Sequence, residues 1–184
     1  SLSNLKIVKG LHYNTLKNKE ELSESSILNE SMVELNTAFT KDGAIISIDD
    51  KAIIETPIEI YNITTCPGLK MIQPRHQIKV GKAAQVSFIE SYHNLCVDSS
   101  FTNAATSINV AKDAVVDYIK IEHPKKPNTY ILDHTMVEQD ANSTFNIYTL
   151  TLRNDLQLCV SLSFGVLVAN LIYFSPLNHK VTKS

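Results

Sequence analysis

The sequence predicts a mainly β protein built as a stacked solenoid, and two observations lead to this prediction. A five-residue pattern recurs four times: a β-branched residue, a short polar turn and then a small apolar residue, at positions 48–52, 80–84, 110–114 and 137–141. The copies are 32, 30 and 27 residues apart. A unit of this size cannot enclose a core alone and must bury its apolar face against neighbouring copies.

The second observation is the strand-like character of the residues on both sides of each pattern. Residues 75–80 and 104–110 precede a turn and alternate apolar with polar side chains, so that Ile78 and Val80 face one side. This alternation predicts one dry and one wet face. Residues 85–89, 115–119 and 142–147 follow a turn and are rich in β-branched and aromatic residues, which indicates second strands after a corner. An antiparallel sandwich with evenly spaced strands is the alternative.

The N-terminal segment, residues 1–43, has a different character. Residues 14–30 are polar and indicate a linker or a marginal helix. Ser31 and Glu34 form a capping-box pattern, and Met32 and the apolar residues after it follow at helical spacing, which predicts a short helix to about residue 40. We expect this helix to cap the first open coil. Coils are expected over 44–158, followed by an apolar tail over 159–184.

Composition bounds the function. The 184 residues suit a single domain with a sizeable core. Seventeen basic and 19 acidic residues give a net charge of −2 without a basic patch, which argues against nucleic acid as the main partner. No signal peptide is recognised at the start of the chain, and the three cysteines form no disulfide framework, so a cytoplasmic location is expected.

The cysteines and histidines form no recognisable metal or catalytic motif. Cys66, Cys96 and Cys159 lack zinc-ligand spacing. Because Cys66 and Cys96 are 30 residues apart, they could stack on adjacent coils as a soft-metal or persulfide site, or serve as small buried hydrophobes. The six histidines show no HExxH spacing, and His76 is expected to be a surface or hydrogen-bonded residue. We therefore predict no catalytic or metal-binding residues and no enzymatic activity; cofactor-binding residues stay unassigned.

Two further polar features of the sequence are an adjacent pairing of acidic residues with histidines and a dense polar cluster. Glu122–His123 and Asp133–His134 are adjacent pairs, whose side chains would point to opposite faces of a strand. A dense cluster of Arg153, Asn154 and Asp155 would either ladder with neighbouring coils or contribute to a partner surface.

Five segments together resemble the SufD branch of the SufB/SufD iron–sulfur cluster assembly proteins. They are residues 35–43, 44–48, 56–60, 74–84 and 152–156, in the family's order. The resemblance implies a right-handed parallel β-helix and a scaffold that pairs with a SufB-like paralogue and docks a SufC-like ATPase. The family handles nascent iron–sulfur clusters, but no cofactor is assigned to this chain and no family site residue is carried over.

The chain departs from that family near its end. Family members continue past the Arg-Asn-Asp segment, which predicts that this chain is a SufD-like fragment lacking the C-terminal part. Residues 159–174 carry no charge but are too short for the ~18–20 apolar residues of a membrane span, so two buried strands or an out-of-frame end are favoured. An open solenoid edge here would favour self-association.

The alternative function is a carbohydrate-binding or carbohydrate-active β-helix. It requires paired carboxylates along one solvent-facing ladder, for which Asp49, Asp50, Asp113 and Asp140 are the candidates. Aspartate is also a common turn residue, so the turns themselves can account for these four.

Overall fold

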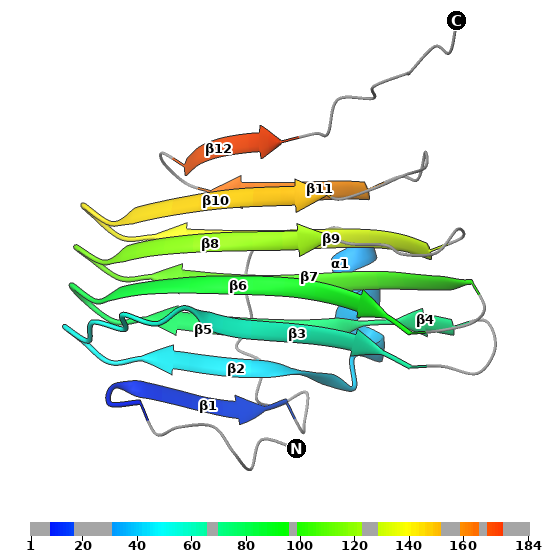
Figure 1. Cartoon of the computed structure of the whole chain (residues 1–184), viewed down its shortest axis with the longest axis horizontal. Coiled ribbons are helices and arrows are strands. Elements are labelled where there is room, and N and C mark those ends of the chain that lie inside the picture. Colours follow the sequence, from blue (N-terminus) through cyan, green and yellow to red (C-terminus); the bar gives the residue numbers. More distant parts are fainter. Residues whose placement is uncertain are drawn as a thin grey trace, which may run out of the picture.

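The structure is a computed structural model that describes residues 8–16, 31–65, 70–95, 99–122, 129–151, 159–165 and 169–174. Two sheets face each other and are built coil by coil, and from β5 onward consecutive strands alternate between the sheets (Figure 1). All strand pairs are parallel except that of β1 with β2. The mainly β solenoid predicted from the sequence is therefore confirmed, and the antiparallel sandwich is wrong.

Sheet A has the order β1-β2-β5-β7-β9-β11, with β4 pairing β7, and sheet B has the order β12-β10-β8-β6-β3. The strands of sheet A are β1 (Leu11–Thr15), β2 (Asp42–Ile48), β4 (Lys70–Ile72), β5 (Pro74–Val80), β7 (Ser100–Val110), β9 (Thr129–Gln139) and β11 (Cys159–Gly165). The strands of sheet B are β3 (Ile58–Thr64), β6 (Gln85–Asn94), β8 (Val115–Glu122), β10 (Thr144–Thr151) and β12 (Ala169–Phe174).

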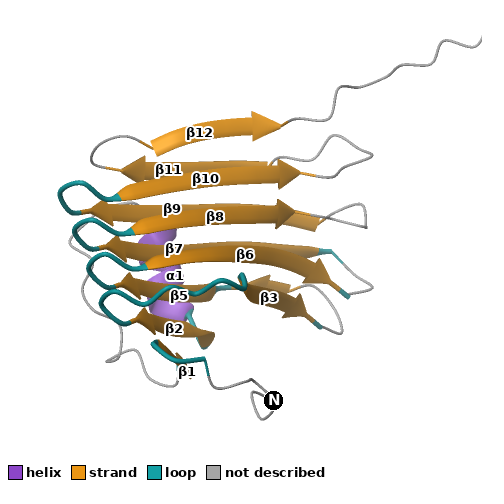
Figure 2. Ribbon diagram, turned by 60° about the vertical axis from the view of Figure 1, so that its left-hand side comes forward, coloured by secondary structure: helices purple, strands orange, loops and turns teal. Residues whose placement is uncertain are grey.

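The corners between the sheets stack in a column, visible as teal loops in Figure 2. At the same step of each corner a backbone N–H donates to the carbonyl of the preceding coil: Gly81 to Ile48, Ala111 to Val80 and Asp140 to Val110. Each corner also contains one non-glycine residue in the left-handed region, namely Lys51, Ala83, Asp113 and Asn142, with φ between 52° and 62°. The repeated pattern in the sequence therefore marks a repeated backbone turn.

The fourth copy of the pattern was predicted two residues too early. Val110 pairs with Gln139 and Val115 pairs with Thr144, which places the fourth corner at 139–143 instead of 137–141. Here Ser143 takes the place of the buried alanine, and Gln139 Nε2 donates to Ser143 Oγ over 3.3 Å. Gln139 and Ser143 occupy the positions of the β-branched residue and the alanine, and this polar pair hides the corner in the sequence.

The apolar core fills the half of the interior next to the corners. The inward side chains of β2, β5, β7 and β9 meet those of β6, β8 and β10, as their alternation predicted. Phe88, Tyr118 and Phe145 form an aromatic column through three coils, with ring centroids 5.8 and 6.2 Å apart. Ala84 and Ala114 are fully buried at their corners, which confirms the tight corner expected at these small residues.

Helix α1 (Ser31–Phe39) has the predicted extent, but it lies in a different place from the one expected. It packs on the outside of sheet A against β5 and β7 (Figure 2), and not over the end of the first coil. Asn36 Nδ2 donates to the carbonyls of Pro74 and Asn103, at 2.9 and 2.7 Å. The helix buries Arg75 on the face that was predicted to be wet.

Gly43 is required where β2 meets β5. A Cβ at this position would lie 1.7 Å from the carbonyl oxygen of Arg75, a distance that no side chain tolerates. The strands approach this closely because Gly43 pairs directly with Arg75. Gly43, which was predicted to turn the chain after the helix, therefore lies within strand β2.

Strand pairing continues beyond residue 158, where the sequence placed the end of the coils. β11 pairs with β9 and β12 pairs with β10, so residues expected to form an apolar tail add one more strand to each sheet. Two strands were one of the interpretations of this segment. Among the described residues no helix is long and apolar enough to cross a membrane.

Candidate functional site

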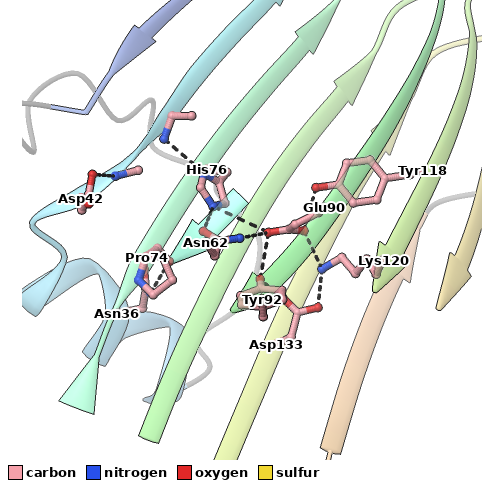
Figure 3. Close-up of polar contacts among 12 residues, drawn as sticks. Asn36, Asp42, Asn62, Pro74, His76, Glu90, Tyr92, Tyr118, Lys120 and Asp133 are labelled. Carbon is pink, nitrogen blue, oxygen red and sulfur yellow. Dashed lines mark hydrogen bonds and ion pairs between the residues drawn. The ribbon is translucent and has the colours of Figure 1, made fainter. Parts of the chain in front are cut away.

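A cluster of buried charged and hydroxyl side chains occupies the half of the interior away from the corners (Figure 3). It consists of His76 on β5, Glu90 and Tyr92 on β6, Tyr118 and Lys120 on β8, and Asp133 on β9; we call it the interior polar cluster. Parallel register places Glu90 directly beside Lys120 on neighbouring strands. Each member points inward because it shares the strand phase of the apolar core residues on its own strand.

Lys120 is the cationic centre of the cluster. Its side chain is fully buried, with Nζ 3.3 Å from Glu90 Oε2 and in an ion pair with Asp133 Oδ2, whose carboxylate is equally buried. Burial alone would lower the pKa of Lys120, but Asp133 and Glu90 outweigh it and raise the pKa. The ammonium is therefore charged, as a buried cation can be only when it is paired.

Glu90 accepts hydrogen bonds from several directions. The hydroxyls of Tyr92 and Tyr118 donate to its two oxygens at 2.8 Å each, and Asn62 Nδ2 donates at 3.0 Å. Burial would raise the pKa of Glu90, but Lys120, the imidazole and the tyrosine hydroxyls lower it to about 2. Glu90 is consequently a carboxylate at any ordinary pH.

The tyrosines and Asp133 complete the cluster. Burial raises the pKa of Tyr92 and of Tyr118 well above the usual value, so both stay protonated and can donate. Burial also raises the pKa of Asp133, and the nearby Glu90 carboxylate adds to this effect, whereas Lys120 opposes it. Two carboxylates thus share one ammonium inside the solenoid.

His76 is held in one tautomer by its neighbours. Its Nδ1 accepts the backbone N–H of Ala44 at 3.1 Å, which leaves Nε2 to donate to Asn62 Oδ1 at 2.9 Å. Burial lowers the pKa of His76, although Glu90 favours its protonated form. The expectation of a hydrogen-bonded histidine is confirmed, but the residue is buried and not on the surface.

The cluster reaches a cavity of about 1370 Å³ at the N-terminal end of the solenoid. Asn62, His76 and Tyr92 line the cavity, while Glu90, Lys120 and Asp133 lie behind them and are not exposed. The charged part of the cluster is thus closed to solvent, and its hydrogen-bonding rim is open to the cavity.

Several residues singled out from the sequence fall outside the described part of the chain. These are Cys66, Cys96, Arg153, Asn154 and Asp155, while Cys159 begins β11 without a described side chain. In the part that is described, no group of three or more histidine, cysteine or acidic residues could hold a metal ion.

The aspartates considered for carbohydrate chemistry do not form a line. The strand register places Asp49 level with Gly81 and Ala111 on the next two coils. It places Asp50 level with two lysines, Lys82 and Lys112. Asp50 Oδ1 accepts the N–H of Lys82 at 2.7 Å, which is a turn contact. These corners therefore offer no stacked pair of carboxylates for glycoside chemistry.

Sequence reasoning missed Glu90, Lys120 and the inward role of Asp133. A signal was present, because residues 86, 88, 90 and 92 read Val-Phe-Glu-Tyr and residues 116, 118, 120 and 122 read Val-Tyr-Lys-Glu. When these two segments are aligned, Glu90 and Lys120 fall at the same position of neighbouring coils, and both share the strand face of the apolar core residues. Asp133 does point away from His134, as the adjacent-pair argument predicted.

The structure places this chain in the class of parallel β-solenoid proteins, with an ionic cluster sealed in its interior. Comparisons with known proteins identify its family. The model of the SufBD core domain of the SUF system for iron–sulfur cluster assembly matches residues 62–160, more than half of the chain. The chain belongs to the SufBD family, and all six members of the interior polar cluster lie in the matched region.

One curated relative supports this assignment. An iron–sulfur cluster assembly SufBD family protein of Synechocystis sp. is 28% identical over 144 residues, which covers 71% of this chain and 32% of the relative. The chain thus spans about a third of the length of that relative. Family membership supports a role in iron–sulfur cluster assembly.

Proposed function

We propose that this chain is a SufD-like scaffold component of an iron–sulfur cluster assembly complex, acting through protein–protein contacts and not as an enzyme. Its partners would be a SufB-like paralogue and a SufC-like ATPase, in the cytoplasm. The observation that carries the proposal is that the SufBD core match, residues 62–160, coincides with an unbroken series of parallel strands from β5 to β10.

The interior of the solenoid favours a scaffold role and not an enzymatic role. The charged groups of the interior polar cluster bind one another and have no solvent exposure, so they stabilise the stack instead of presenting a reactive group. A rigid stack leaves its outer faces and end strands for partners.

Co-purification tests this proposal. The full chain carries an affinity tag and is co-expressed with a SufB-like protein and a SufC-like ATPase from the same organism. We expect the three to elute together in size-exclusion chromatography. Separate elution of this chain from both would contradict the scaffold role, and preference for a SufD-like over a SufB-like partner would contradict the SufD-like subtype.

Self-association through the C-terminal end is a related proposal. β11 and β12 are the last strands of the two sheets among the described residues, and an end strand presents backbone groups for pairing. We expect light scattering to show a mass that rises with concentration for the isolated chain. A constant monomer mass at high concentration would contradict it.

A further inference from the structure

The two sheets end at different levels at the N-terminal end of the solenoid. Among the described residues, sheet A extends through β2 to β1, whereas sheet B stops at β3, which pairs with β6 alone. In the described part of the chain, sheet B therefore lacks a strand opposite β1. The missing position is one strand wide, about 4.8 Å.

The cavity of about 1370 Å³ runs along this free edge. All seven residues of β3 line it, together with residues of β1, α1 and the segment 53–57. Its inner wall contains the hydrogen-bonding rim of the interior polar cluster, formed by Asn62, His76 and Tyr92. The space thus lies where the next strand of sheet B would pack.

Exposed apolar side chains are concentrated around the cavity. Of the eleven large hydrophobic residues that are exposed in the described part, seven line it: Val8, Tyr13, Phe39, Ile53, Tyr61, Ile63 and Met71. Singly scattered apolar residues are ordinary on a surface, but a contiguous group of this size marks an interaction site.

The charged residues around the cavity indicate the charge that a binding partner would carry. Asp42, Glu55 and Glu59 line it and are exposed, against a single exposed cation in the lining, Lys41. A strand added beside β3 would place its outward side chains next to Glu59, Tyr61 and Ile63. Of these three neighbours, Glu59 offers a basic residue a favourable cross-strand pair. Its inward side chains would lie next to Ile58 and Ile60, where apolar residues fit.

A second copy matches this end in shape but not in charge. β1 projects one strand beyond β3, so two copies related by a two-fold axis could each place β1 beside β3 of the other. Residues 11–15 contain no lysine or arginine, so β1 of a second copy would give Glu59 no basic cross-strand neighbour.

We propose that the edge of β3 is a docking site for one extended segment of a partner protein, with alternating apolar and basic side chains. The segment adds to sheet B as a parallel or antiparallel strand, inserts its apolar side chains into the cavity and places its basic side chains beside Glu59 and Glu55. Backbone hydrogen bonds supply affinity, and the alternation supplies specificity.

Fluorescence anisotropy of the full chain with three labelled octapeptides tests the proposal. The first alternates valine and lysine, the second has four valines followed by four lysines, and the third alternates valine and glutamate. We expect saturable binding of the first peptide, about tenfold tighter than that of the other two. Equal binding of the three, or no saturable binding at about 1 mM peptide, would overturn the proposal.

Matched variants locate the site. Ile53→Ser is paired with Leu95→Ser, because both side chains are similarly exposed, at 64% and 63%, and only Ile53 lines the cavity. Glu59→Lys is paired with Glu138→Lys, which replaces an exposed carboxylate on β9. We expect the cavity variants to weaken binding of the first peptide about three- to tenfold and the controls to leave it unchanged.

Two other outcomes would count against the proposal. If the controls weaken binding as much as the cavity variants do, the peptide binds elsewhere. If no peptide binds and Ile53→Ser instead abolishes self-association in light scattering, the occupant is a second copy of the chain. Circular dichroism of each variant confirms that the fold is intact.

Discussion

At the scale of single residues, the solenoid keeps charged side chains in its interior by pairing them with one another. A buried ammonium or carboxylate is costly unless it is paired and hydrogen-bonded. Lys120 meets this condition through Glu90 and Asp133, and Glu90 also receives the two tyrosine hydroxyls. Removing one member therefore exposes the full desolvation cost of the others.

Lys120→Met tests this coupling. The methionine fills a similar volume but leaves the carboxylates of Glu90 and Asp133 buried without their cation. We expect a loss of about 3–5 kcal/mol in the free energy of unfolding, measured by urea denaturation. The control is Lys112→Met at an exposed corner position, which should change stability by less than about 0.5 kcal/mol. Equal effects of the two would contradict a buried ionic cluster.

The lowered pKa of His76 predicts a pH dependence. Below about pH 6.5 the unfolded chain takes up a proton that the folded chain resists, so stability falls as the pH decreases. Burial and Lys120 oppose the protonated form in the folded chain, whereas Glu90 and Asp133 favour it. The loss is at most about 1.4 kcal/mol per pH unit, because this one group takes up at most one more proton in the unfolded chain. A flatter stability profile between pH 7.5 and 5.5 is expected for His76→Gln. An identical slope in both proteins would contradict the prediction.

The positions of individual charged side chains were the part of the structure that the sequence predicted least well. Alternation placed Ile78, Val80 and the corner alanines in the core, because hydrophobicity and strand phase agree there. Glu90 and Lys120 share that phase, but the ordinary expectation for a charged residue is the surface. Their burial depends on a partner in another coil, which becomes visible only once the register of the coils is known.

At the scale of elements, the corners determine how the coils stack. Each corner requires one residue with positive φ, and the four corners use lysine, alanine, aspartate and asparagine there instead of glycine. A left-handed conformation costs a non-glycine residue roughly 1–2 kcal/mol. The backbone hydrogen bonds between successive corners hold that conformation in place.

Neighbouring alanines give opposite predictions at one corner. Ala83 has a φ of 52°, so Ala83→Gly relieves strain and should raise the free energy of unfolding by up to about 1 kcal/mol. Ala84 is fully buried, so Ala84→Gly removes a packed methyl and should lower it by about 1–2 kcal/mol. Thermal unfolding of the two variants measures the difference. Changes of the same sign would argue against the corner geometry.

Helix α1 is attached to sheet A through Asn36. Asn36→Ala removes two hydrogen bonds to buried carbonyls, and we expect a loss of about 1–3 kcal/mol together with faster hydrogen exchange over 31–39. Lys41→Ala, an exposed neighbour of the helix, is the control. Unchanged exchange in Asn36→Ala would show that the helix is held by other contacts.

The existence of most elements could be predicted, but not all of their positions. The capping box gave the limits of α1 because it is a local signal. Its docking site depends on carbonyls from β5 and β7, which are distant in sequence, and the expected end cap was wrong for that reason. The fourth corner was misplaced because Gln139 and Ser143 lack the apolar character of the earlier copies.

At the scale of the whole molecule, the solenoid has two unlike ends. Among the described residues, sheet A extends one strand beyond sheet B at the N-terminal end, beside a largely apolar cavity, and β11 and β12 form the other end. Membership of the SufBD family supports a role in iron–sulfur cluster assembly, and the scaffold role proposed above would use the outer faces of the stack for partners. The repeat could be predicted from the sequence, because each coil requires the same tight turn at its corner.

Disulfide cross-linking tests the stacking of the coils most directly. Ser47 on β2 pairs with Lys79 on β5, which in turn pairs with Asn109 on β7. In a chain whose native cysteines are replaced by serine, Ser47→Cys with Lys79→Cys should form an intramolecular disulfide on oxidation, because adjacent parallel strands lie within bonding range. Ser47→Cys with Asn109→Cys, two coils apart, should stay reduced. Efficient bonding in the second pair, or none in the first, would contradict the parallel stack.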